Sequence, residues 1–178
     1  MSRLLLVFLT LSLLLSGCGV PDAFGPGARL DLASFEEKDV AVQIGLEIDA
    51  AGQAWLAATF TPLEAGYHLY AMDTPRQGVD GLGRPTLLEL VPGSQLQAAG
   101  PLTANLEPQP AEGEEGLFVY PVGPVTLRLP VTLPPGMDWV DEQVSVTYMT
   151  CSGNSCSPPV QGRLVPIRVP GADLVTNP

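Results

Sequence analysis

The chain has 178 residues, and its 8 Lys plus Arg against 19 Asp plus Glu give a formal net charge of −11 at pH 7. The negative electrostatic field of such a chain repels phosphate backbones, so the composition argues against nucleic-acid binding. Acidity can also favour basic partners, but the solubility of an exported domain is a sufficient reason for it.

Residues 1–17 are predicted to be a signal peptide. The run Leu4 to Leu15 is almost wholly apolar and too short to span a bilayer comfortably. It ends in Leu15-Ser16-Gly17-Cys18, which resembles the lipobox of bacterial lipoproteins. That resemblance implies that Cys18 is lipidated and becomes the mature N-terminus, since acyl chains hold a protein on a membrane. The expected location is the cell envelope, on a bacterial membrane facing the periplasm or the exterior, where disulfides form.

The prolines and glycines between Gly19 and Ser34 are typical of a tether, so residues 18–34 are interpreted as a lipid-anchored linker. Residues 35–178 are then expected to form one domain. A chain of that size buries roughly two-thirds of its unfolded surface, so its core does not require disulfides.

The first predicted strands form a hairpin. Apolar residues alternate with others from Val40 to Ile48, which is the period of a strand with one buried face. Asp49 to Gln53 predicts a turn, and Ala54 to Phe60 predicts the returning strand.

Shorter strands are expected next, at Gly66 to Met72 and Thr86 to Val91, around a glycine-rich loop from Asp73 to Arg84. Pro92 to Gly116 is rich in Pro, Gly and acidic residues, and is expected to be a long loop or to contain one short strand. Loops of this length in small domains are often functional.

The last predicted strands are 125–133, 143–150 and 163–169, with Pro134-Pro135-Gly136 as a turn. Seven or eight short strands joined by turns predict an all-β domain, an immunoglobulin-like β-sandwich. Pro130 and Pro166 lie within strand-like runs, which favours edge strands or bulges at those positions.

Two of the three cysteines, Cys151 and Cys156, flank the turn sequence Ser152-Gly153-Asn154-Ser155. Strand parity places Cys151 with Ser145, Thr147 and Met149 on the more polar face, at a strand end. Such a turn can bring two Cα atoms within the ~4.4–6.8 Å that a disulfide requires, so a disulfide is plausible here.

Residue chemistry leaves the purpose of that disulfide open. Closing so short a loop contributes only about 2 kcal/mol, which is a weak reason for a structural bond. Nothing in the loop is basic, and Arg163 is the nearest cation in sequence, so no self-activated nucleophile is indicated. The pair is compatible with attack by a partner's more reactive thiolate.

Three segments together resemble the N-terminal periplasmic domain of the thiol:disulfide interchange protein DsbD, over roughly residues 40–169. They read G-Y-H-L-Y-A-M at 66–72, V-T-L-R-L-P-V at 125–131 and V-T-Y-M-T-C-S-G-N-S-C-S-P-P-V at 146–160. That domain is an immunoglobulin-like sandwich whose cysteine pair passes electrons from a thioredoxin-like donor to exported thiol proteins. The family member compared has five residues between its cysteines, and this chain has four.

The resemblance also implies roles for individual residues. Cys156 would form the mixed disulfide with partners, and Cys151 would resolve it. His68 and Tyr70 would lie beside the pair, where they would screen the thiols or assist proton transfer. The chain ends at Pro178 without transmembrane or thioredoxin-like domains, so the expected partners are a separate membrane electron-transfer protein or thioredoxin-like exported proteins.

Three functions follow as hypotheses. The first is an envelope-anchored thiol:disulfide exchange domain that cycles Cys151 and Cys156 and needs no cofactor. The second is a non-enzymatic binding or assembly lipoprotein in which the disulfide is structural. The third, which no spacing signature supports, is a copper(I) site formed by these cysteines with Met149 and His68.

Overall fold

The computed structural model describes residues 27–136 and 138–176, so the predicted signal peptide and Cys18 lie outside the described residues. Its elements in chain order are β1 (Arg29–Glu37), β2 (Val40–Ile48), β3 (Ala54–Pro62), β4 (His68–Leu69), β5 (Leu87–Leu90), β6 (Gln97–Ala98), β7 (Thr103–Ala104), β8 (Gln109–Pro110), β9 (Phe118–Val119), β10 (Val125–Thr132), β11 (Trp139–Tyr148), β12 (Thr150–Cys151), β13 (Val160–Pro170) and α1 (Ala172–Thr176). No helix in this described part has the length and apolar character needed to cross a membrane.

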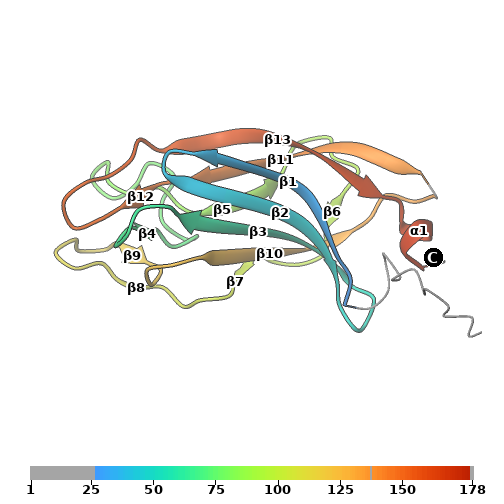
Figure 1. Cartoon of the computed structure of the whole chain (residues 1–178), viewed down its shortest axis with the longest axis horizontal. Coiled ribbons are helices and arrows are strands. Elements are labelled where there is room, and N and C mark those ends of the chain that lie inside the picture. Colours follow the sequence, from blue (N-terminus) through green and yellow to red (C-terminus); the bar gives the residue numbers. More distant parts are fainter. Residues whose placement is uncertain (1–26, 137, 177–178) are drawn as a thin grey trace, which may run out of the picture.

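The strands form two antiparallel layers that face each other across one core (Figure 1). The larger sheet has the order β1-β2-β3-β10-β6, with β7 also paired to β10, and the smaller has the order β13-β11-β5. The predicted all-β fold, with antiparallel sheets arranged as a sandwich, is confirmed.

The core follows from the alternation in the sequence, because every second residue of a strand points to the same side. In β2, the five residues Val40, Val42, Ile44, Leu46 and Ile48 are at most 4% exposed. The other sheet supplies the opposing layer from β11 and β13: Val144, Val146, Val165, Ile167 and Val169.

The two prolines within strands occupy different environments. Pro166 lies in β13, which pairs only with β11 among the described strands, so the expectation of an edge holds there. Pro130 lies in β10, between β3 and the short strands β6 and β7. The carbonyl of Pro130 accepts from the amide of Ala99 at 2.8 Å, so its missing N–H faces the side where β6 and β7 leave a gap in the pairing.

Two differences from the sequence prediction concern loops. Strand β1 begins at Arg29, so the last six residues of the predicted tether, 29–34, belong to this strand, and all but Leu32 pair with β2. Leu30 and Leu32 of this strand pack against the core, which gives the segment a reason to be ordered. The segment 92–116 contains three two-residue strands, β6, β7 and β8, where at most one was expected.

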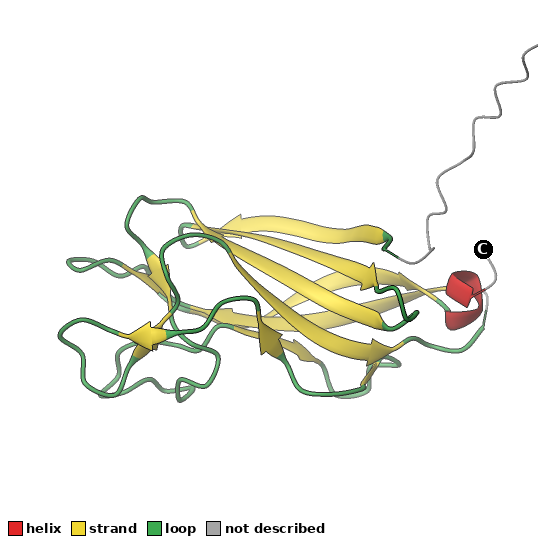
Figure 2. Ribbon diagram, turned by 90° about the horizontal axis from the view of Figure 1, so that it is seen from below, coloured by secondary structure: helices red, strands yellow, loops and turns green. Residues whose placement is uncertain are grey.

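Four short strands gather at one end of the sandwich, opposite α1 (Figure 2). They form two small sheets, β12 with β4 and β8 with β9. Because their backbone pairing is so brief, side chains and loops must hold this end together. It is here that Cys151 lies.

Candidate functional site

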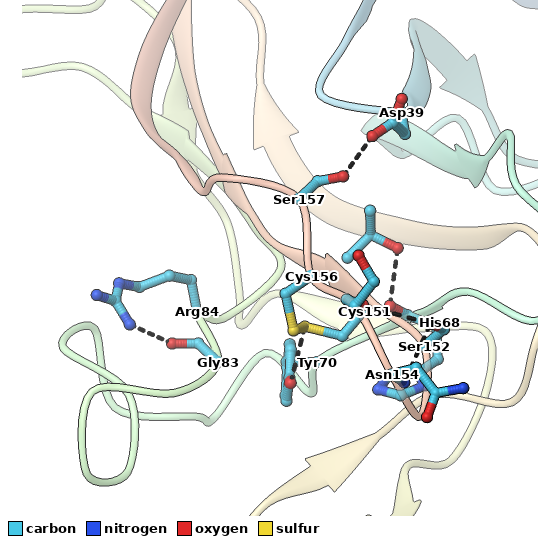
Figure 3. Close-up of a disulfide and its surroundings, with 12 residues drawn as sticks. Asp39, His68, Tyr70, Gly83, Arg84, Cys151, Ser152, Asn154, Cys156 and Ser157 are labelled. Atoms are coloured by element: carbon cyan, nitrogen blue, oxygen red, sulfur yellow. Dashed lines mark hydrogen bonds between the residues drawn. A yellow bond between two sulfur atoms is a disulfide. The ribbon is translucent and has the colours of Figure 1, made fainter.

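Cys151 and Cys156 form a disulfide, so the pairing predicted as plausible is present (Figure 3). Their Cα atoms lie 4.0 Å apart, which is closer than the range expected from the sequence. Cys151 closes β12. The turn between the cysteines is held by the amide of Ser152, which donates to the carbonyl of Ser155 at 2.7 Å. The amide of Asn154 donates to Oγ of Ser152 at 3.4 Å. The sequence therefore predicted both the bond and the turn that closes it.

The two sulfur-bearing residues differ sharply in exposure. Cys151 is 2% exposed, whereas Cys156 is an exposed residue of the loop. Cys151 belongs to a small apolar cluster with Tyr70, Leu117 and Met149. The face that parity assigned as the more polar one is thus buried, because loops outside the two main sheets cover it. A molecule that approaches from solvent meets Cys156 first.

Tyr70 contacts the buried sulfur directly: its hydroxyl donates a hydrogen bond to Sγ of Cys151 at 3.1 Å. The ring is fully buried, and its backbone carbonyl accepts from Oγ1 of Thr86 at 2.7 Å. Burial raises the pKa of Tyr70 to about 12, and the charge of Glu114 adds to the shift. The phenol therefore stays protonated near neutral pH and remains a donor to the sulfur.

His68 pairs with Cys151 across β4 and β12, and its ring meets the ring of Tyr70 edge-on, with the centroids 5.6 Å apart. Oγ1 of Thr150 donates to its carbonyl at 2.9 Å, which fixes one small strand against the other. Burial lowers the pKa of His68, although Glu114 acts in the opposite direction. The imidazole is therefore neutral at pH 7.

Gly83 lies close against the ring of Tyr70. Its φ is +76°, and a Cβ built there would lie 2.9 Å from Cδ1 of Tyr70 and 3.3 Å from Cδ2 of Leu117. An L side chain would thus be strained in its backbone and would collide with the ring. Glycine at this position lets the loop close over the aromatic face.

The disulfide loop is also tied to the large sheet. Oγ of Ser157 donates to the carboxylate of Asp39 in the β1–β2 turn, and the amide of Ser157 donates to the carbonyl of Thr150 at 3.0 Å. The carbonyl of Asp39 in turn accepts from the amide of Leu63 at 2.8 Å. These bonds position the exposed cysteine relative to a rigid scaffold.

The structure brings together four residues that the sequence selected: Cys151, Cys156, His68 and Tyr70. Sequence reasoning missed Glu114, whose charge acts on both His68 and Tyr70. A usable signal existed, because Glu112 to Gly116 is an acidic, glycine-flanked segment of a loop already expected to be functional. Within the described ranges, no set of three or more His, Cys, Asp or Glu side chains is arranged to hold a metal ion.

No family model and no curated protein matches the sequence. Among solved structures, the chain is similar to the crystal structure of the N-terminal domain of DsbD from Neisseria meningitidis in the reduced form. The identity is 17%, the TM-score is 0.41, and the match covers 65% of this chain and 76% of that chain.

Proposed function

We propose that this protein is an envelope-anchored thiol:disulfide exchange domain whose Cys151–Cys156 pair alternates between disulfide and dithiol. Its partners would be thioredoxin-like exported proteins or a membrane electron-transfer protein. The observation that carries the proposal is the asymmetry of the pair: Cys156 is exposed, while Cys151 is buried and accepts the hydrogen bond of Tyr70.

Exchange requires an attacked sulfur and a leaving sulfur, and the asymmetry supports Cys156 as the attacked sulfur and Cys151 as the leaving one. A partner thiolate attacks Sγ of Cys156, a new disulfide forms between partner and Cys156, and the Cys151–Cys156 bond breaks. Cys151 leaves as a thiolate, and the Tyr70 hydroxyl already directed at it stabilises that charge. A second thiolate of the partner then attacks the partner's own sulfur and releases Cys156, which completes a two-electron reduction.

The reduced pair runs the same steps in reverse. The Cys156 thiolate attacks an exported protein's disulfide, and one sulfur of that protein leaves as a thiolate. The Cys151 thiolate then attacks Sγ of Cys156, and the second sulfur of the exported protein leaves. The pair is again a disulfide, and the exported protein has gained both electrons.

The direction of β1 suits a domain anchored through Cys18. The strand ends next to the disulfide loop, since Asp39, which follows it, accepts from Ser157. Its first residue, Arg29, lies roughly 26 Å away at the rise of an extended strand. An anchor that precedes Arg29 would therefore hold the opposite end of the domain and leave the cysteine pair accessible to partners.

A structural disulfide in a binding or assembly lipoprotein is the competing function. An ordered loop suits a structural role, and hydrogen bonds order this one through Ser152, Ser155, Ser157 and Thr150. The same bonds weaken the need for a covalent pin, because the loop is closed without it. Closing six residues contributes only about 2 kcal/mol.

Trapping separates the two functions. Cys151→Ser leaves Cys156 unable to be resolved, so a cell-envelope extract should yield protein joined to thioredoxin-like proteins through Cys156. Cys156→Ser is the control, because its remaining cysteine is buried and should capture little. An absence of adducts with Cys151→Ser under oxidising conditions, in protein that is folded by circular dichroism, would support the structural pin.

A further inference from the structure

A pocket of about 490 Å³ adjoins the disulfide loop. Ser152 and Gly153, which lie between the two cysteines, form one wall, and His68 forms another. The hairpin 109–119 also lines the pocket and contributes Glu112 and Glu114. A partner that docks on the disulfide loop to reach Cys156 would therefore place neighbouring side chains near this pocket, because Ser152 and Gly153 of the same loop line it.

The charges around the pocket do not balance. Two carboxylates line it, and no Lys or Arg is among its lining residues. The one basic side chain in the lining is His68, and burial lowers its pKa, which favours the neutral imidazole. The pocket is therefore negative in the absence of an occupant.

Glu114 is an independent sign of a missing partner. Its Oε2 atom is fully buried, and no described residue donates a hydrogen bond to it. Buried carboxylate oxygens are normally paired, since an unpaired one loses its hydration without compensation. Glu114 is also one of the residues that line the pocket, so the lining includes a carboxylate with one oxygen that no described residue fills.

We propose that this pocket binds the ammonium or guanidinium group of a lysine or arginine on the partner protein, near the thiol that exchanges with Cys156. The inference rests on the proposed function, because the cation is useful here only if a thiol docks at the loop. Charge-assisted hydrogen bonds to Glu114 would hold its head group. Val122, which is 64% exposed at the pocket rim, would contact its apolar stem.

The consequence for exchange is selectivity by charge. A cleft of one sign concentrates opposite charge and raises association rates by roughly 10 to 10³-fold, and the effect falls with ionic strength. Thiols that carry a nearby cation should therefore reduce the disulfide faster than equally reactive thiols that carry an anion. The selectivity should depend on Glu114 and Glu112 rather than on the net charge of the domain.

The test uses blocked cysteine peptides that differ at one position, two residues from the cysteine, where they carry lysine, glutamine or glutamate. Rates are measured at equal thiolate concentration by acid quenching, alkylation and mass spectrometry of the mixed disulfide. The wild-type protein should react about tenfold faster with the lysine peptide than with the glutamate peptide at low salt. The difference should shrink at high salt.

Two variants locate the selectivity. Glu114→Gln and Glu112→Gln should each reduce the preference for the lysine peptide, and the rate with the glutamine peptide should change little. Glu36→Gln removes one charge from an exposed position of β1 outside the pocket and serves as the control. Because Glu112 is exposed, its variant should fold even if Glu114→Gln does not.

The outcomes separate the inference from the proposed function. Equal rates for all three peptides would overturn the cation pocket and leave exchange itself intact. A preference lost equally in Glu36→Gln would assign it to the overall field and would also overturn the pocket. No reaction with any peptide would instead contradict thiol exchange.

Discussion

The hydroxyl of Tyr70 donates to Sγ of Cys151 at 3.1 Å, although 81 positions of sequence separate the two residues. The bond is directed at the buried sulfur of the pair and not at the exposed one. A leaving sulfur gains most from such a donor, because its charge develops as the disulfide breaks. In the proposed exchange, Tyr70 would therefore favour cleavage with Cys151 as the leaving sulfur.

Tyr70→Phe should slow reduction of the disulfide by about tenfold. Hydrogen bonds to charged groups contribute about 1.5–3 kcal/mol and neutral ones about 0.5–1.5 kcal/mol. The difference, roughly 1.4 kcal/mol, is the stabilisation that the developing thiolate of Cys151 would lose in the variant, and it corresponds to a factor of ten in rate. The measurement is the second-order rate constant with dithiothreitol at pH 7.

Tyr120→Phe is the matched control for that variant. Tyr120 is also buried, but its hydroxyl accepts from the amide of Met72 at 3.2 Å and is not bonded to a sulfur. It should alter stability and leave the exchange rate near the wild-type value. Equal rates for Tyr70→Phe and wild type would show that the bond does not assist cleavage.

Gly83→Ala should destabilise the site more than Gly81→Ala. Both glycines have positive φ, +76° and +84°, so both substitutions carry the backbone cost of roughly 1–2 kcal/mol. The new Cβ at position 83 would also meet the ring of Tyr70 at 2.9 Å, whereas nothing lies within 4 Å at position 81. Urea unfolding should show the larger loss for Gly83→Ala, together with a slower exchange rate. Equal losses would mean that the loop does not press on the ring.

Stability should fall as pH rises above 10. Burial raises the pKa of Tyr70 to about 12 and also raises the pKa values of Tyr120 and Tyr148. The unfolded chain releases these protons near pH 10, and the folded protein retains them until higher pH. The unfolded state therefore binds fewer protons in this window, so unfolding becomes more favourable as pH rises.

Urea midpoints between pH 8 and pH 11.5 test that dependence. The stabilisation is fully present below pH 10 and is progressively lost toward pH 12. Tyr70→Phe should show a shallower decline than wild type, because one of the three groups is gone. A flat midpoint across this range would contradict the burial of the phenols.

Reduction of the disulfide should leave the domain folded. The short loop contributes about 2 kcal/mol, and hydrogen bonds from Ser157 to Asp39 and Thr150 persist without it. Unfolding free energies of oxidised and reduced protein should therefore differ by about that amount. Complete unfolding on reduction would instead identify the bond as a structural pin.

The long strands could be predicted because apolar residues alternate with other residues along them, and the apolar positions are the buried ones. Val40 to Ile48 is the best example, with every apolar position of the pattern buried. The sequence also predicted the disulfide, because the Ser-Gly-Asn-Ser turn is local. Both features depend only on residues close together in the chain.

The sequence could not predict what covers Cys151. Leu117, Val79, Leu82 and Ala111, which pack in or against the apolar cluster that contains Cys151, lie in loops whose paths are set by tertiary contacts. For the same reason strand parity assigned Cys151 to a polar face. The acidic composition of residues 112–116 was a signal for Glu114, but it could not show that one carboxylate oxygen lacks a donor in the folded chain. The extent of β1 was missed because prolines and glycines just before Arg29 are typical of linkers.

The reduction potential of the pair tests the central claim most directly. Protein equilibrated in glutathione or dithiothreitol buffers of graded ratio should show one reversible two-electron transition, read by alkylation of Cys151 and Cys156. A potential between roughly −120 and −270 mV, the range of known thiol:disulfide oxidoreductases, is the predicted result. A potential below about −300 mV would mark a structural disulfide and contradict exchange as the function of this site.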